Sequence, residues 1–246
     1  MEADFFDIAL YSTVAGLSTV AGVYLVKGFS EWTRRNFQYL ISFAVGVIMA
    51  TAFIDLLAEA VSLSGAWFAG ALAAFLVLYL IEFGLNIHYC RYEACKEEGH
   101  IRPVGRVSAL GIGLHSLLDG FTIGVGFEAG FAIGVIASFA VIFHELPEGA
   151  FTYMLLIHDR VEEGRATIFS WLVALATPFG AIATYLLIRD VSEATLGILL
   201  AIAGGTFIYI AAADLVPETH RRSRIGNAAL VLIGVAFVIV LGWLVG

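Results

Sequence analysis

Residues 104–157 read VGRVSALGIGLHSLLDGFTIGVGFEAGFAIGVIASFAVIFHELPEGAFTYMLLI, and this stretch decides the fold. It holds two apolar runs, 104–127 and 131–157, with only a few residues between them. A run of about 20 mostly apolar residues is long enough to cross the hydrocarbon core of a bilayer as a helix. The short connection therefore predicts a tight hairpin of two transmembrane helices.

The composition of the whole chain agrees with this interpretation. Of its 246 residues 60% are hydrophobic and 14% are charged, and the mean hydropathy is +0.92. An ordinary soluble domain has about 25% charged residues. The composition excludes a disordered chain, and no soluble core could bury so much apolar surface. The net charge of −8 gives no basic surface for nucleic acid. We therefore expect an all-α integral membrane protein.

Eight segments are long and apolar enough to span a bilayer, which predicts eight transmembrane helices. Only short loops remain between them, so we expect a single transmembrane domain over residues 1–246. The acidic start of the chain predicts that the first segment is an uncleaved helix rather than a signal peptide. The segments are approximately 5–26, 37–61, 66–88, 104–127, 131–157, 165–188, 194–216 and 225–245.

The lysines and arginines predict the orientation of these helices. Twelve of the 13 lie in the loops that follow the first, third, fifth and seventh segments, and Arg189 is the exception. Positively charged loops stay on the cytoplasmic side. The pattern therefore places both termini on the extracytoplasmic side, and it supports the count of eight because an error of one span would scramble the alternation.

The predicted spans carry acidic residues but no basic residue near their middle. A carboxylate in hydrocarbon costs about 2.5–3.5 kcal/mol even on the mild insertion scale. Such groups must be protonated, hydrated or paired with a partner from outside the chain, and a bound cation is the natural partner. The acids are Asp55, Glu59, Glu82, Asp119, Glu145, Glu148, Asp214 and Glu218, and His115 and His144 join them.

Spacing singles out a central group among these residues. His115 precedes Asp119 by four positions and His144 precedes Glu148 by four, so each pair shares one helix face. The hairpin lets the two pairs face each other, and Glu145 can reach the same side. Two imidazoles with two or three carboxylates suit Zn²⁺, Fe²⁺, Mn²⁺ or a similar divalent ion. The set lacks thiolates for copper(I) and is too rich in nitrogen for a dedicated Mg²⁺ or Ca²⁺ site.

The remaining acids predict a path for a cation through the bilayer. Asp55 and Glu59 lie toward the outer end of their span, whereas Glu82, Asp214 and Glu218 lie toward the inner side. The alternative interpretation is that Glu59, Glu218 and His88 are solvated helix ends.

Prolines predict local breaks in the helices. Pro147 lies between Glu145 and Glu148, where it removes one backbone hydrogen bond, and Pro178 and Pro217 do the same in later spans. Broken helices at membrane depth line protein-buried or water-filled cavities. The loop from Cys90 to His100 is expected to be a plain cytoplasmic loop rather than a metal-capturing one.

Two motifs resemble those of the ZIP (Zrt-/Irt-like) family of divalent metal transporters. They are HSLLDG at His115–Gly120 and HELPEG at His144–Gly149, with supporting similarity at Ser42–Ala60 and Gly204–Glu218. The resemblance implies eight helices in an inverted 3+2+3 repeat, with the transport site on the fourth and fifth helices. It also implies metal movement into the cytoplasm, often by a dimer, in the cell membrane.

The resemblance further assigns roles to single residues. It makes His115, Asp119, His144 and Glu148 primary ligands, and it makes Glu145 a ligand of an adjacent second metal. Many family members have Asn at the position of Ser116, and some have Glu at that of Thr177, so we expect one strong metal site. Asp55 stands where many members have His.

The predicted function is transport of a divalent transition metal (zinc, with iron, manganese and cadmium as further candidates) as substrate, with no cofactor and no enzymatic activity. One alternative is an intramembrane zinc hydrolase, because His144-Glu145 opens like H-E-x-x-H, although Glu148 stands at the second His. The other is a proton-coupled carrier of organic substrates, which explains the acids but not the two paired histidines.

Overall fold

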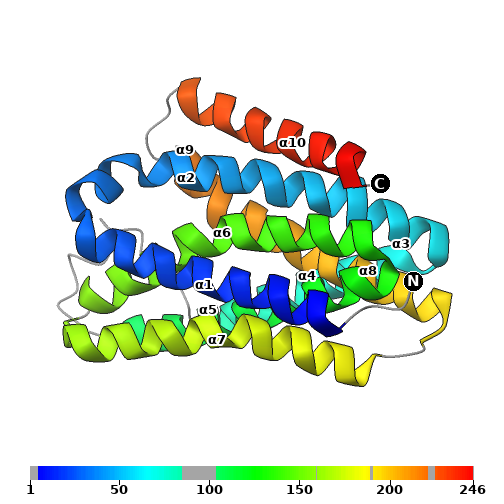
Figure 1. Cartoon of the computed structure of the whole chain (residues 1–246), viewed down its shortest axis with the longest axis horizontal. Helices are drawn as coiled ribbons and strands as arrows, with labels where there is room; N and C mark the ends of the chain where they lie inside the picture. Colours follow the sequence, from blue (N-terminus) through cyan, green and yellow to red (C-terminus); the bar gives the residue numbers. More distant parts are fainter. Residues whose placement is uncertain (1–4, 85–103, 159, 189–190, 221–224, 246) are drawn as a thin grey trace.

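The structure is a computed structural model that describes residues 5–84, 104–158, 160–188, 191–220 and 225–245. All the elements in these ranges are helices, which lie side by side in one bundle (Figure 1). They are α1 (Phe5–Gly28), α2 (Ser30–Ala50), η1 (Thr51–Leu56), α3 (Leu57–Leu63), α4 (Trp67–Gly84), α5 (Val104–Ala129), α6 (Phe131–His158), α7 (Glu163–Leu187), α8 (Glu193–Tyr209), η3 (Ile210–Leu215), α9 (Val216–His220) and α10 (Ile225–Val245).

Within the described residues, six helical stretches are long and apolar enough to cross a membrane. A seventh apolar stretch, Trp67–Ile81 in α4, is shorter. The prediction of an all-α membrane protein is confirmed for this part of the chain. The six stretches are Phe5–Gly28, Arg35–Leu63, Phe131–His158, Glu163–Leu187, Glu193–His220 and Ile225–Val245.

Two of these stretches contain a π-helical segment that the apolar patterns did not predict. In η1 and η3 the backbone widens for six residues, and Asp55 and Asp214 lie in these segments. Pro217 follows η3 closely, but no proline follows η1. By contrast, α6 and α7 continue through Pro147 and Pro178. Irregular helix geometry therefore occurs at Asp55, where no break was predicted, and just before Pro217, where one was, but not at Pro147 or Pro178.

The hairpin between α5 and α6 is as tight as the sequence predicts. α5 ends at Ala129 and α6 begins at Phe131, so Gly130 alone connects them. Gly130 has a φ of 152°, a conformation that glycine adopts readily and other residues do not. This turn brings the two motif-bearing helices alongside each other.

Close helix packing fixes how α5 and α6 face their neighbours. Gly149 of α6 lies against the backbone of α1, and a Cβ atom there would overlap the carbonyl oxygen of Thr19. Gly120 of α5 lies in the same way against Thr177 of α7. Small residues permit such backbone approach between membrane helices. Each glycine directly follows an acidic residue of the predicted site, Glu148 or Asp119, so these contacts fix the depth of both acids.

Candidate metal centre

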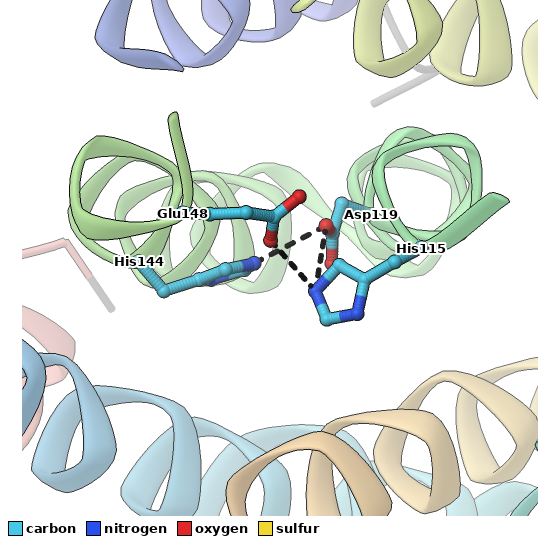
Figure 2. Close-up of side chains that lie close together, drawn as sticks. All are labelled: His115, Asp119, His144 and Glu148. Carbon is cyan, nitrogen blue, oxygen red and sulfur yellow. Dashed lines mark ion pairs between the residues drawn. The ribbon is translucent and has the colours of Figure 1, made fainter. Parts of the chain in front are cut away.

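Four side chains from α5 and α6 meet between the two helices. α5 provides His115 and Asp119 one turn apart, and α6 provides His144 and Glu148 with the same spacing. Figure 2 shows all four pointing toward one another. Each offers one possible ligand atom, and these atoms all lie within 4.8 Å of one another. The structure thus brings together the two pairs that helix periodicity predicted.

The distances between these atoms are those of a compact coordination sphere. Asp119 Oδ2 lies 3.2 Å from His144 Nε2 and 3.4 Å from His115 Nε2, and Glu148 Oε2 lies 3.1 Å from His115 Nε2. Zinc bonds of about 2.0–2.1 Å to nitrogen and oxygen give a tetrahedron with edges of about 3.3 Å. Three contacts of this length therefore fit a cation placed between the four side chains.

The imidazole of His144 has its orientation set by a backbone hydrogen bond. Its Nδ1 lies 2.8 Å from the carbonyl oxygen of Ala140, one turn earlier in α6. A carbonyl only accepts, so Nδ1 donates, and in the neutral ring Nε2 keeps the lone pair. A hydrogen bond from the ring nitrogen that does not bind the metal fixes the tautomer of metal-binding histidines in this way. The ring also packs edge-on against the buried Phe207 of α8, with centroids 5.9 Å apart.

Burial divides the four residues into a buried pair and a partly exposed pair. Asp119 and His144 are 1% and 2% exposed, whereas the side chains of Glu148 and His115 are 12% and 17% exposed. Within the described residues no lysine or arginine pairs with Asp119 or Glu148. Two carboxylates with so little water and no basic partner need a cation or a proton between them and the imidazoles.

Ser116, at whose position many members of the resembling family have Asn, contacts the group of four. It is fully buried, and its hydroxyl donates to Glu148 Oε1 at 3.0 Å. The other oxygen of Glu148 faces His115. This contact could not be predicted from helix periodicity, because Ser116 and Glu148 belong to two different helices.

Glu145 lies outside the group of four, although the sequence placed it on the same side. Its carboxylate is fully buried and accepts hydrogen bonds from Thr19 of α1 at one oxygen and Thr177 of α7 at the other. Both oxygens are therefore occupied by threonine hydroxyls. This arrangement holds α6 between α1 and α7.

The predicted path residues whose side chains the structure describes do not join the group of four. Asp55 is half-buried in η1, and its Oδ2 atom has no hydrogen-bond partner among the residues that the structure describes. Glu59 lies in the first turn of α3 and Glu218 in α9. Glu82 and Asp214 belong to α4 and η3, but their side chains lie outside the described part of the structure. The Cys90–His100 loop also lies outside the described residues.

Comparisons with known proteins agree with this geometry. The model of the family described as "ZIP Zinc transporter" matches residues 91–242. Zinc transporter ZIP6 of Homo sapiens is 32% identical over 133 residues, which cover 53% of this chain and 17% of that protein. Metal cation symporter ZIP14 of Danio rerio is 32% identical over 116 residues, 46% of this chain and 22% of that protein. Zinc transporter zipt-7.1 of Caenorhabditis briggsae is 30% identical over 107 residues, 43% and 27% respectively.

The chain spans a small part of the length of these relatives, between 17% and 27% in the three alignments. The family match nevertheless covers more than half of this chain and includes the group of four and most of α5–α10. The chain is a multi-pass membrane protein that belongs to the ZIP zinc transporter family.

Proposed function

We propose that this protein carries divalent transition-metal ions across a membrane, with zinc as the first candidate and iron, manganese and cadmium as further ones. The ion is the substrate and not a resident cofactor. The observation that carries the proposal is the buried group of two imidazoles and two carboxylates, whose ligand atoms lie within 4.8 Å of one another. Mixed nitrogen and oxygen donors suit this class of ion.

We propose that His115, Asp119, His144 and Glu148 hold one ion at a time. The support is their mutual distances of 3.1–3.4 Å and the fixed Nε2 lone pair of His144. Glu145 is left out of this set because it does not belong to the group of four, and its two oxygens instead accept hydrogen bonds from Thr19 and Thr177. The hydroxyl of Thr177 stands where a second carboxylate would be needed to hold a second cation.

Eight spans arranged as an inverted repeat of three helices around the α5–α6 pair are also part of the proposal. The two halves have matching contacts around that pair. Thr19 and Gly22 of α1 approach α6, while Thr177 and Gly180 of α7, with the same spacing, approach α5. These matching contacts support equivalent places for α1 and α7 in the two proposed halves.

The π-helical segments support the same arrangement. Asp55 lies in η1 and precedes Glu59 by four residues, and Asp214 lies in η3 and precedes Glu218 by four residues. We propose that these acids and Glu82 line the path of the ion on the two sides of the central group. π-helical segments are frequent at functional sites, and two at equivalent places match the predicted ladder of acids.

The ends of the helices support a direction of access. α1 ends at the same end of the bundle at which α6 ends and α7 begins (Figure 1). Lys27 lies in the last turn of α1, at this end. Glu148 is nearer to this end than His144, and in the antiparallel α5 His115 is nearer than Asp119. These two nearer residues are the partly exposed pair. We propose that the ion in this conformation exchanges with the cytoplasm, and that helix movement opens the opposite side.

Two other activities explain the site less well. In a zinc hydrolase of the H-E-x-x-H type the glutamate acts as general base beside the metal. Here Glu145 is held by Thr19 and Thr177, and Glu148 replaces the second histidine. A carrier of organic substrates needs proton-relaying acids but gives no reason for His115 and His144 to converge on Asp119.

Zinc uptake into proteoliposomes tests the proposal. We expect the purified protein to move Zn²⁺, and His144→Ala and Glu148→Ala to abolish this movement. His158→Ala and Glu128→Ala are matched controls on the same two helices, away from the group, and should retain it. Normal uptake by His144→Ala and Glu148→Ala would overturn the site assignment, and peptidase or lipid hydrolysis without flux would favour the hydrolase.

Topology, membrane and oligomeric state need separate tests. We propose extracytoplasmic termini, a location in the cell membrane and, on the family resemblance alone, a homodimer. Cys90 and Cys95 are first replaced by serine, and then single cysteines are placed at Arg160 and Ser192. An impermeant thiol reagent added to intact cells should label Ser192→Cys and not Arg160→Cys. Light scattering of the detergent-solubilised protein would give its mass, and a monomer would contradict the dimer.

A further inference from the structure

The hydrogen bond between Ser116 and Glu148 has a consequence for ion selectivity. Ser116 Oγ lies 3.0 Å from Glu148 Oε1 and 3.1 Å from the carbonyl oxygen of Ile112. A hydroxyl has one proton, and an ionised carboxylate is the stronger acceptor of the two. Ser116 is fully buried and its position on α5 is fixed by the helix. Its hydroxyl therefore holds one specific oxygen of Glu148.

The contact turns the Glu148 carboxylate so that one oxygen alone faces the group. Oε2 lies 3.1 Å from His115 Nε2, while Oε1 is held by Ser116. Asp119 differs, because within the described residues neither of its oxygens has a hydrogen-bond donor. The site consequently offers two nitrogens and at most three carboxylate oxygens. Without the hydroxyl, Glu148 could bind through both oxygens and the site would offer six donors.

The number of available donors discriminates among divalent ions. Zn²⁺ is almost always four-coordinate in protein sites and sometimes five-coordinate. Mn²⁺ prefers octahedral sites with six ligands, mostly oxygen, and bidentate carboxylates are typical of ions with high coordination numbers. A device that removes one carboxylate oxygen from reach therefore favours Zn²⁺ at the expense of Mn²⁺.

We propose that Ser116 is a specificity-determining residue, whose hydroxyl restricts Glu148 to one metal-facing oxygen and thereby favours Zn²⁺ over Mn²⁺. The inference rests on the proposed function for its cargo, but it concerns binding and can be tested without transport. Ser116 acts through Glu148 and does not itself bind the ion.

Two pairs of variants isolate the hydroxyl from the shape of the side chain. The first pair is the native chain and Ser116→Ala, which differ by the hydroxyl. The second pair is Ser116→Thr and Ser116→Val, whose side chains have nearly the same shape but of which only threonine has a hydroxyl. Zn²⁺ and Mn²⁺ affinities are measured on the detergent-solubilised full chain by competition. Loss of a hydrogen bond to a metal ligand typically lowers metal affinity about 10–100-fold. We therefore expect Ser116→Ala and Ser116→Val to lower the Zn²⁺/Mn²⁺ affinity ratio about tenfold. Ser116→Thr should keep the ratio.

Visible absorption of Co²⁺ gives a second readout for variants that are shown to bind Co²⁺, because unbound aqueous Co²⁺ is itself octahedral and absorbs weakly. Co²⁺ absorbs strongly in four- and five-coordinate sites and weakly in octahedral ones. We expect strong bands for the native chain and Ser116→Thr, and weak bands for Ser116→Ala and Ser116→Val. If Ser116→Val does not fold, Ser116→Ala against the native chain suffices.

The outcomes separate this inference from the proposed transport. An unchanged Zn²⁺/Mn²⁺ ratio and an unchanged Co²⁺ spectrum in variants that still bind Zn²⁺ would overturn the role of Ser116 and leave transport intact. A native chain that binds Co²⁺ but moves no Zn²⁺ would overturn the proposed function, while the affinity ratio and spectra still decide the role of Ser116. A native chain that binds neither ion would overturn both.

Discussion

His144 Nε2 lies 3.2 Å from Asp119 Oδ2, and both atoms carry lone pairs when the imidazole is neutral and the carboxylate is ionised. The backbone carbonyl of Ala140 accepts the Nδ1 proton of the ring, which leaves Nε2 without a hydrogen. Two electron-rich atoms at this distance repel each other unless a proton or a cation lies between them. The contact therefore needs a proton or a cation between α5 and α6, and the metal ion of the proposed function would be such a cation.

Asp119→Asn tests whether the charge of this carboxylate holds the ion. Asparagine has nearly the same shape but lacks the negative charge, so the group of four keeps one carboxylate instead of two. We expect zinc affinity to fall by at least about 10–100-fold, the range found for less direct contacts. Titration calorimetry on the solubilised protein measures it. Glu128→Gln, on the same helix and outside the group, should bind zinc as the native chain does.

Glu145→Gln tests whether the buried glutamate is a ligand or a link between helices. Glutamine can accept a hydrogen bond from Thr177 and donate one to Thr19, so the contacts of α6 with α1 and α7 are preserved. Because Glu145 lies outside the group of four, we expect one zinc per chain in both the native protein and the variant. Metal analysis by mass spectrometry gives this ratio. Two zinc ions in the native chain and one in Glu145→Gln would show that Glu145 is a ligand.

Two glycines next to the acidic ligands are expected to tolerate no side chain. A methyl group at Gly120 or Gly149 would overlap a backbone carbonyl oxygen of the neighbouring helix. Overpacking of this kind costs about 1–3 kcal/mol, and more where the backbone cannot move. Gly120→Ala and Gly149→Ala should lower the thermal unfolding temperature in detergent. Gly65→Ala is the control, since nothing lies within 4 Å of its position, and an equal effect at all three positions would contradict the packing argument.

Phe207→Leu tests the packing of the His144 ring. The edge-on contact between the two rings is lost, and aromatic pairs contribute about 0.5–1.5 kcal/mol beyond area burial. If this energy orients the imidazole, zinc affinity should fall roughly 2- to 10-fold. Phe237→Leu is the control, because Phe237 of α10 packs edge-on against Phe143 of α6 and this contact does not involve the imidazole. If Phe207→Leu binds zinc with native affinity, the hydrogen bond to Ala140 is sufficient to orient the His144 imidazole.

The sequence predicted the parts of the site that depend on local periodicity. The spacing of four between His115 and Asp119, and between His144 and Glu148, placed each pair on one helix face. The short connection at Gly130 then predicted that the two faces meet. Helix geometry and a one-residue turn are local properties, so the group of four could be derived without the rest of the fold.

Contacts between distant helices could not be derived in this way. Glu145 is only three residues from Glu148, yet Thr19 and Thr177 hold its carboxylate away from the group, and they belong to α1 and α7. The π-helical segment at Asp55 also has no local signal, since no proline lies near it in the sequence. Both features depend on packing between segments far apart in the chain, which composition and spacing do not specify.

A zinc-soaked crystal of the full chain, measured at the zinc absorption edge, tests the central claim most directly. The expected result is one anomalous peak between α5 and α6, about 2.0–2.2 Å from His144 Nε2, His115 Nε2, Asp119 Oδ2 and Glu148 Oε2. Glu145 should remain on Thr19 and Thr177. A peak that contacts neither histidine would contradict the assignment of the metal centre. The absence of a peak, in a protein that binds one zinc ion per chain in solution, would contradict it as well.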